Sequence, residues 1–185
     1  MATKNGTSEK LTEPLFGSAE NARMTGTGPS IWLAGDPEGL VRNSRATGLN
    51  VAMGAGNYVH MTHAPELDDL TVEQIAGQII HDVEQGVGDT GVRSGIIGEI
   101  GCSWPWHDRE KKTLEAAVIA QRETGAPLLI HPGRNERAPI ELLEAVDKWG
   151  GDLNRTVMGH IERTVYDRGI LNELIGMGSY LNFDL

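Results

Sequence analysis

The sequence predicts an α/β protein of the (β/α)₈ TIM-barrel type, present as an incomplete barrel of about five βα units. Two observations predict this fold. Short apolar segments, typical of strands buried on both faces, alternate along the chain with amphipathic helical segments. Three of the short segments also end at or near a residue that can bind metal, namely Glu99, His131 or His160. Functional residues of a (β/α)₈ barrel lie at the carboxyl ends of successive strands, so this placement favours a barrel.

A doubly wound parallel sheet is the alternative architecture. Such a sheet usually has a Gly-rich phosphate-binding turn after an early strand, with an acidic residue further along the chain. The segment "GAGNYVH" after Val51 is only a fragment of that pattern and has no acidic partner at the expected distance. The barrel is therefore the predicted fold.

The first two helices are predicted from their end signals. In "DPEGLVRNSRATG", Asp36 is the expected N-cap, Pro37 the first helical residue and Gly48 the stop, and the strand "LNVAMGAG" follows. In "TVEQIAGQIIHDVEQG", Thr71 and Gln74 form a capping box, and the strand "SGIIGEIG" follows.

Three more helices each lead into a strand. The third runs from an expected cap at Asp108 to Gly125 and leads into "APLLIH". The fourth, "APIELLEAVDKWGG", leads into "TVMGH", and the fifth, "DRGILNELIGMG", leads into "SYLNFDL". Their predicted core-facing residues are Leu114, Ala117, Val118, Gln121, Leu142, Leu143, Val146, Ile170, Leu171, Leu174 and Ile175.

Composition limits the possible partners. The 185-residue chain has a net charge of −10 and a pI near 5.0, which argues against nucleic acid or an anionic membrane as a partner. The single cysteine, Cys102, cannot form an internal disulfide, and we expect it to be a small buried residue. The beginning of the chain lacks the apolar segment of a signal peptide, and no segment is long and apolar enough to span a bilayer. These features predict a cytoplasmic protein.

The domain organisation is predicted to be simple. Residues 1–30 are polar and glycine-rich without helical or strand periodicity, so we expect a loosely ordered N-terminal segment. Residues 31–185 are expected to form one partial (β/α) barrel domain.

The three residues at the strand ends suggest a metal site. Glu99 lies in an otherwise apolar strand, where an unpaired carboxylate would cost roughly several kcal/mol. Imidazole nitrogens and carboxylate oxygens both suit Zn²⁺, and a carboxylate can bridge two ions. A single histidine at a strand end is more often structural, but three ligand types on consecutive strands favour a metal.

Several ordered motifs resemble the phosphotriesterase-related proteins of the amidohydrolase superfamily. The segments are "ATGLNVAMGAGNYV", "TGVRSGIIGEIGCSWP", "GAPLLIHPGR", "GGDLNRTVMGHIERT" and "YLNFDL", so the resemblance extends from about residue 35 to the end. It implies a (β/α)₈ barrel with a binuclear metal centre, usually zinc, in which a metal-activated hydroxide hydrolyses a small-molecule substrate. The hydrolysed bond in such proteins is a phosphotriester, lactone, carboxylic ester or amide.

The resemblance also implies roles for four residues. Glu99 matches the carboxylate that bridges the two ions, and His131 and His160 match the histidines that follow the fifth and sixth strands. These three would be both the metal ligands and the catalytic centre. Tyr58 matches an aromatic residue that lines the substrate pocket near the metals, although a packed loop aromatic is the plainer alternative.

The chain departs from the family pattern at the remaining ligands. No His-x-His motif occurs in the 185 residues, and the chain ends at "FDL", near the end of the seventh strand, before the eighth-strand aspartate. Asp184 lies in the wrong strand to replace that aspartate. A second hypothesis is therefore a catalytically inactive barrel fragment that binds metal weakly, or pairs with a copy of itself or a complementary chain through its exposed strand edges.

Other residues near the strand ends are secondary candidates. His60 and His63 could serve as makeshift ligands or be solvated loop histidines, and His81 and His107 are expected to be structural. Trp104 and Trp106 could form a pocket wall or an aromatic plug over the barrel rim.

Overall fold

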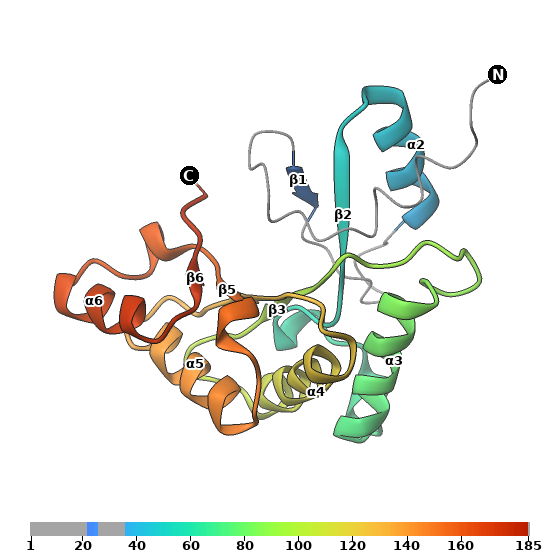
Figure 1. Cartoon of the computed structure of the whole chain (residues 1–185). Helices are drawn as coiled ribbons and strands as arrows, with labels where there is room; N and C mark the ends of the chain where they lie inside the picture. The colour runs from blue at the N-terminus through green and yellow to red at the C-terminus, as the bar shows by residue number, and fades with distance from the viewer. Residues whose placement is uncertain (1–21, 26–35, 185) are drawn as a thin grey trace.

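The structure, a computed structural model, describes residues 22–25 and 36–184 and contains one parallel sheet (Figure 1). Its strands follow one another in chain order, and each pairs in parallel with the next. They are β1 (Ala22–Thr25), β2 (Asn50–Ala55), β3 (Ile96–Gly101), β4 (Leu128–His131), β5 (Thr156–Met158) and β6 (Tyr180–Leu181). The helices are α2 (Pro37–Thr47), α3 (Val72–Glu84), α4 (Asp108–Thr124), α5 (Ala138–Lys148) and α6 (Arg168–Gly176).

The arrangement of the helices confirms the predicted fold class. From β2 to β6, each pair of sequential strands is joined by one helix, and α3, α4, α5 and α6 lie along the same side of the sheet in Figure 1. A doubly wound sheet would have helices on both of its faces. Sequential parallel strands with helices on one side are the arrangement of a (β/α) barrel, here with four βα units, β2–α3 to β5–α6, and the further strand β6 in the described residues 36–184.

Helix ends lie close to the positions that the sequence predicts. The Asp36 side chain accepts a hydrogen bond from the Gly39 N–H, and Gly48 ends α2 in a left-handed conformation with φ of 70°. Thr71 and Gln74 form the predicted capping box. The prediction of Asp108 as the N-cap of α4 is wrong by one residue, because the His107 ring occupies that position and accepts from the Arg109 N–H.

The core lies between the sheet and the helices. Ile97, Ile100 and Ile130 of the strands and Leu114 and Leu143 of the helices are fully buried, and Cys102 is buried as expected. Burial, and then the charge of Glu110, raise the pKa of the Cys102 thiol well above its usual value. This thiol is therefore an unreactive core residue.

The predicted core face of α6 needs one correction. Leu174 is buried and Ile170 and Leu171 are half-buried, but Ile175 is 58 % exposed. Five residues of α-helix turn the chain by about 500°, so Ile175 lies well away from the direction of Ile170.

The expectation of loose order for residues 1–30 lies mostly outside the described residues. Within that segment the structure describes only β1, which pairs in parallel with β2. The expected domain boundary near residue 31 also lies outside the described part. None of the helices in the described residues combines the length and the hydropathy that crossing a membrane requires.

Candidate metal centre

Glu99 lies within β3, where the pairing of the strand is irregular. Ile97 pairs with Leu128 and Ile100 with Ile130, so three steps along β3 match two steps along β4. Bulges of this kind redirect a side chain beside functional sites. Gly98 has φ of 133°, and a Cβ at this position would lie 2.4 Å from the Leu129 carbonyl oxygen, so only glycine fits there.

The two histidines lie at the same edge of the sheet. His131 is the last residue of β4, and His160 follows β5 by two residues. The His160 backbone is left-handed, with φ of 56° and ψ of 40°, a conformation that is uncommon for residues other than glycine.

The functional atoms of the three residues converge, as the strand positions predict. His131 Nδ1 lies 3.2 Å from Glu99 Oε2, and His160 Nε2 lies 3.2 Å from Glu99 Oε1. The two imidazole rings are edge to face, with centroids 4.5 Å apart. Each residue offers one possible ligand atom, and these three atoms all lie within 4.8 Å of one another. Each carboxylate oxygen therefore faces a different imidazole.

The site fits a divalent cation on its own geometry. His160 Nε2 is buried and has no hydrogen-bond partner among the described residues. It lies 3.2 Å from Glu99 Oε1, but the two groups are not aligned for a hydrogen bond. An unpartnered imidazole nitrogen beside a carboxylate and a second imidazole is a suitable ligand set for Zn²⁺. The side chains are 15–17 % exposed, which leaves access from solvent.

Asp184 fixes the orientation of His160. Its Oδ2 lies 2.8 Å from His160 Nδ1, on the opposite side of the ring from Glu99. A proton on Nδ1 can be donated to Asp184, which leaves Nε2 unprotonated and available as a ligand. Asp184 thus acts as a supporting group for His160. His160, Glu162 and Asp184 also form a second, more exposed set of possible ligand residues.

Tyr58 lies directly against His131. Its hydroxyl is 3.0 Å from His131 Nε2, and the two rings are edge to face with centroids 4.8 Å apart. Burial, and then the charge of Glu99, raise the pKa of Tyr58. The hydroxyl therefore stays protonated at neutral pH.

Arg163 is a residue of this site that the sequence analysis did not identify. Its Nη2 lies 3.1 Å from His131 Nε2. The only sequence signal is its position three residues after His160, in a short segment without strand or helix periodicity.

A buried carboxylate positions the loop that contains Tyr58. Glu110 of α4 is fully buried and accepts hydrogen bonds from the backbone and ring of His60, from the backbone and hydroxyl of Ser103, and from the His107 N–H. Gly101 allows the same loop to lie against β3, since a Cβ there would be 2.2 Å from the Val59 nitrogen. Glu110 lies four residues before Leu114, on the apolar face of α4. A charged residue on that face is the sequence signal that could have identified a buried carboxylate here.

His60 and His63 lie outside the ligand cluster. His60 bonds to Glu110 and stacks on His107, with ring centroids 4.1 Å apart. His63 is buried, and its Nε2 lies 2.6 Å from the Tyr58 carbonyl oxygen. Neither is a solvated loop histidine, because both help to fix the Tyr58 loop.

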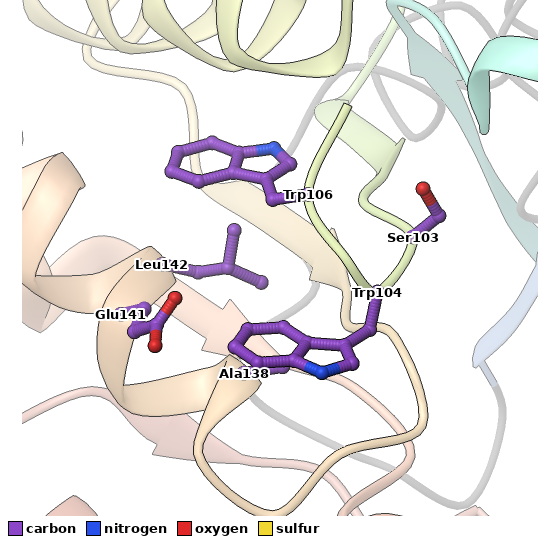
Figure 2. Close-up of a pocket in the computed structure, with 6 residues that line it drawn as sticks. All are labelled: Ser103, Trp104, Trp106, Ala138, Glu141 and Leu142. Carbon is purple, nitrogen blue, oxygen red and sulfur yellow. The ribbon is translucent and has the colours of Figure 1, made fainter. Parts of the chain in front are cut away.

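The two tryptophans pack against α5. Figure 2 shows both indole rings on the side of Ala138 and Leu142 of α5, in a hollow that has no room for a water molecule. Trp106 also lies 6.1 Å from Trp149, centroid to centroid. Trp104 also lies against the loop after β4, since a Cβ at Gly133 would be 2.7 Å from the Trp104 Cβ.

The fold and this ligand cluster define an α/β barrel protein with a candidate metal centre at the carboxyl edge of its sheet. The model of the phosphotriesterase family matches residues 27–185, and the chain belongs to that family. This membership confirms the resemblance seen in the motifs.

The relatives agree. The chain is 46 % identical over 146 residues to N-acetyltaurine hydrolase of Danio rerio, covering 79 % of this chain and 42 % of the relative. It is 41 % identical over 174 residues to phosphotriesterase-related protein of Nematostella vectensis, covering 90 % and 50 %. The chain thus spans about half the length of the curated relatives it matches.

Solved structures show the same fold. The phosphotriesterase homology protein of Escherichia coli, complexed with phosphate in its active site, superimposes with a TM-score of 0.81 at 25 % identity, covering 89 % of this chain and 56 % of that one. A resiniferatoxin-binding protein of Rhodobacter sphaeroides superimposes with a TM-score of 0.78 at 35 % identity, covering 81 % and 42 %.

Proposed function

We propose that this chain provides the metal-binding core of a zinc-dependent hydrolase that cleaves an ester-type or amide bond in a small molecule. The observation that supports the proposal most strongly is the position of the Glu99 carboxylate, with one imidazole nitrogen 3.2 Å from each of its oxygens. Such an arrangement of donors is typical of a metal centre. Glu99 Oε2 is within hydrogen-bond distance and geometry of His131 Nδ1, but His160 Nε2 faces Oε1 without a hydrogen bond, which a purely structural carboxylate would be expected to make.

Each residue has a distinct part in the proposal. Glu99 would bind through both oxygens, His131 through Nδ1 and His160 through Nε2, with Asp184 keeping the proton on His160 Nδ1. A divalent metal bound there supplies a Lewis acid that polarises the substrate and lowers the pKa of water. Tyr58, protonated and next to His131, can donate a hydrogen bond to a substrate oxygen.

The names of the relatives suggest the bond that is cleaved. Several relatives that are at least 40 % identical are N-acetyltaurine hydrolases, which act on an amide whose amine part ends in a sulfonate. A small N-acyl amide is therefore the first substrate class to test for this chain. Phosphotriesters, lactones and carboxylic esters are the other classes.

The test is hydrolysis by the purified chain with added Zn²⁺ or Mn²⁺, measured with N-acetyltaurine, a lactone, an aryl ester and an aryl phosphotriester. We expect any turnover to need the metal, to disappear with a chelator and to fall to background in Glu99→Gln and His131→Ala. Turnover that is unchanged by the chelator, or by both substitutions, would contradict the proposal.

The second candidate is an inactive barrel segment that binds metal weakly and pairs with another chain. Two observations favour it: the 185 residues contain no His-x-His motif, and β6, which lies at the end of the described sheet, is near exposed Ile175 and Phe183. Light scattering together with the hydrolysis assay separates the candidates. A stable oligomer that binds zinc, with no turnover even when the segment is completed by the missing strands of a relative, supports this second candidate.

A further inference from the structure

Arg163 is a half-buried cation at the ligand cluster without an acidic partner. It ends the short 3₁₀ helix Ile161–Arg163, and no carboxylate of the described residues lies within ion-pair distance of its guanidinium. Arg109, which is similarly half-buried, pairs with Asp68. Removing a guanidinium partly from water costs free energy that an acidic partner would offset, and Arg163 has no such acidic partner among the described residues.

Its one close contact is incompatible with a loaded site. Arg163 Nη2 lies 3.1 Å from His131 Nε2, while His131 Nδ1 faces Glu99. A neutral imidazole that binds metal through Nδ1 carries its proton on Nε2, and a guanidinium can only donate. The Tyr58 hydroxyl, 3.0 Å from Nε2, can accept that proton, but Arg163 is then left without an acceptor.

We infer that Arg163 binds an anionic group of the substrate, a sulfonate or a carboxylate, next to the bond that is cleaved. Both groups present paired oxygens that match the fork of donors on a guanidinium. The chain has a net charge of −10, so a small anion needs a local positive charge to approach Glu99. This inference rests on the proposed function and assigns it a substrate class.

The test uses three acetamides of similar size that differ in charge. N-acetyltaurine carries a sulfonate, N-acetyl-β-alanine a carboxylate, and N-ethylacetamide no charge. Their binding to the whole chain is measured by NMR titration with and without Zn²⁺, in the parent, in Arg163→Gln and in the control Arg155→Gln. Arg155 is exposed and precedes β5, at the opposite end of that strand from His160. The zinc content of each protein is measured in parallel.

We expect the parent to bind both anionic probes at least about tenfold more tightly than N-ethylacetamide. Arg163→Gln should lose this preference and keep its zinc, while Arg155→Gln should keep both. Equal binding of the three probes by the parent, or an unchanged preference in Arg163→Gln, would overturn the inference even where zinc binds. Failure to bind zinc would instead count against the proposed function, and the titrations without Zn²⁺ would still decide the role of Arg163.

Discussion

Glu99 is the residue on which the proposed centre most depends, because it is the only member of the cluster that is expected to carry a negative charge. Replacing Glu99 by Gln keeps the shape of the side chain and removes the charge that attracts the cation. We expect zinc affinity to fall by more than about 100-fold, beyond the 10–100-fold effect of changing a supporting group. The measurement is zinc content after dialysis.

Tyr58→Phe is the matched control for this change. It removes a hydroxyl next to His131 and leaves the three ligands intact, so zinc content should stay close to that of the parent. Equal zinc content in Glu99→Gln and the parent would show that Glu99 is not a ligand.

At the scale of elements, Glu110 joins α4 to the loops that follow β2 and β3. A glutamine there keeps one acceptor and places an amide donor against the N–H groups of Ser103 and His107. Because buried donors would lose their acceptor, we expect the free energy of unfolding to fall by about 3 kcal/mol. Urea unfolding measures this, and hydrogen exchange should show faster exchange at residues 58–63.

Glu123→Gln, on the exposed side of the same helix, is the control for Glu110. A solvent-exposed change of this kind should alter stability by no more than about 0.5 kcal/mol. If Glu110→Gln is as stable as this control, Glu110 does not clamp the loops.

Asp82 of α3 predicts that the free energy of unfolding falls as the pH rises. Burial raises its pKa to about 6, against a weaker opposing effect of His81. The folded state thus favours the protonated form, and it loses stability as the pH rises from about 4 to about 6. Asp82→Asn should therefore be more stable than the parent by roughly 1–3 kcal/mol at pH 8, and by less at pH 4.5.

Urea unfolding at the two pH values tests this, with Asp147→Asn on the exposed face of α5 as the control. If Asp82→Asn raises the free energy of unfolding equally at both pH values, or if the control shows the same increase, the buried charge of Asp82 is not the cause.

The elements were largely predictable because their signals are local. Caps such as Asp36 and Thr71, and runs such as residues 96–101, depend on neighbouring residues, and parallel strands place their carboxyl ends at one edge. The convergence of Glu99, His131 and His160 followed from that rule. The partners of Arg163 and Glu110 come from segments far apart in the sequence, and the irregularity at Gly98 depends on β4. No local pattern indicates such contacts.

At the scale of the whole molecule, the number of ligands limits the activity that we expect. This sequence has three ligand residues of the proposed centre and no His-x-His motif, so we predict little or no turnover by the 185-residue chain. The same segment completed by the first, second and eighth strands of a relative should hydrolyse its substrate. Rapid hydrolysis by the chain alone would contradict this prediction and would show that other residues complete the site.

X-ray absorption at the zinc edge shows whether Glu99, His131 and His160 bind one metal together. The tag-free chain loaded with Zn²⁺ should contain about one ion, with nitrogen and oxygen ligands at about 2.0–2.1 Å and no sulfur. The imidazole contribution should correspond to two histidines in the parent and to one in His131→Ala and in His160→Ala. A sulfur ligand, or an imidazole contribution that neither substitution changes, would contradict the account.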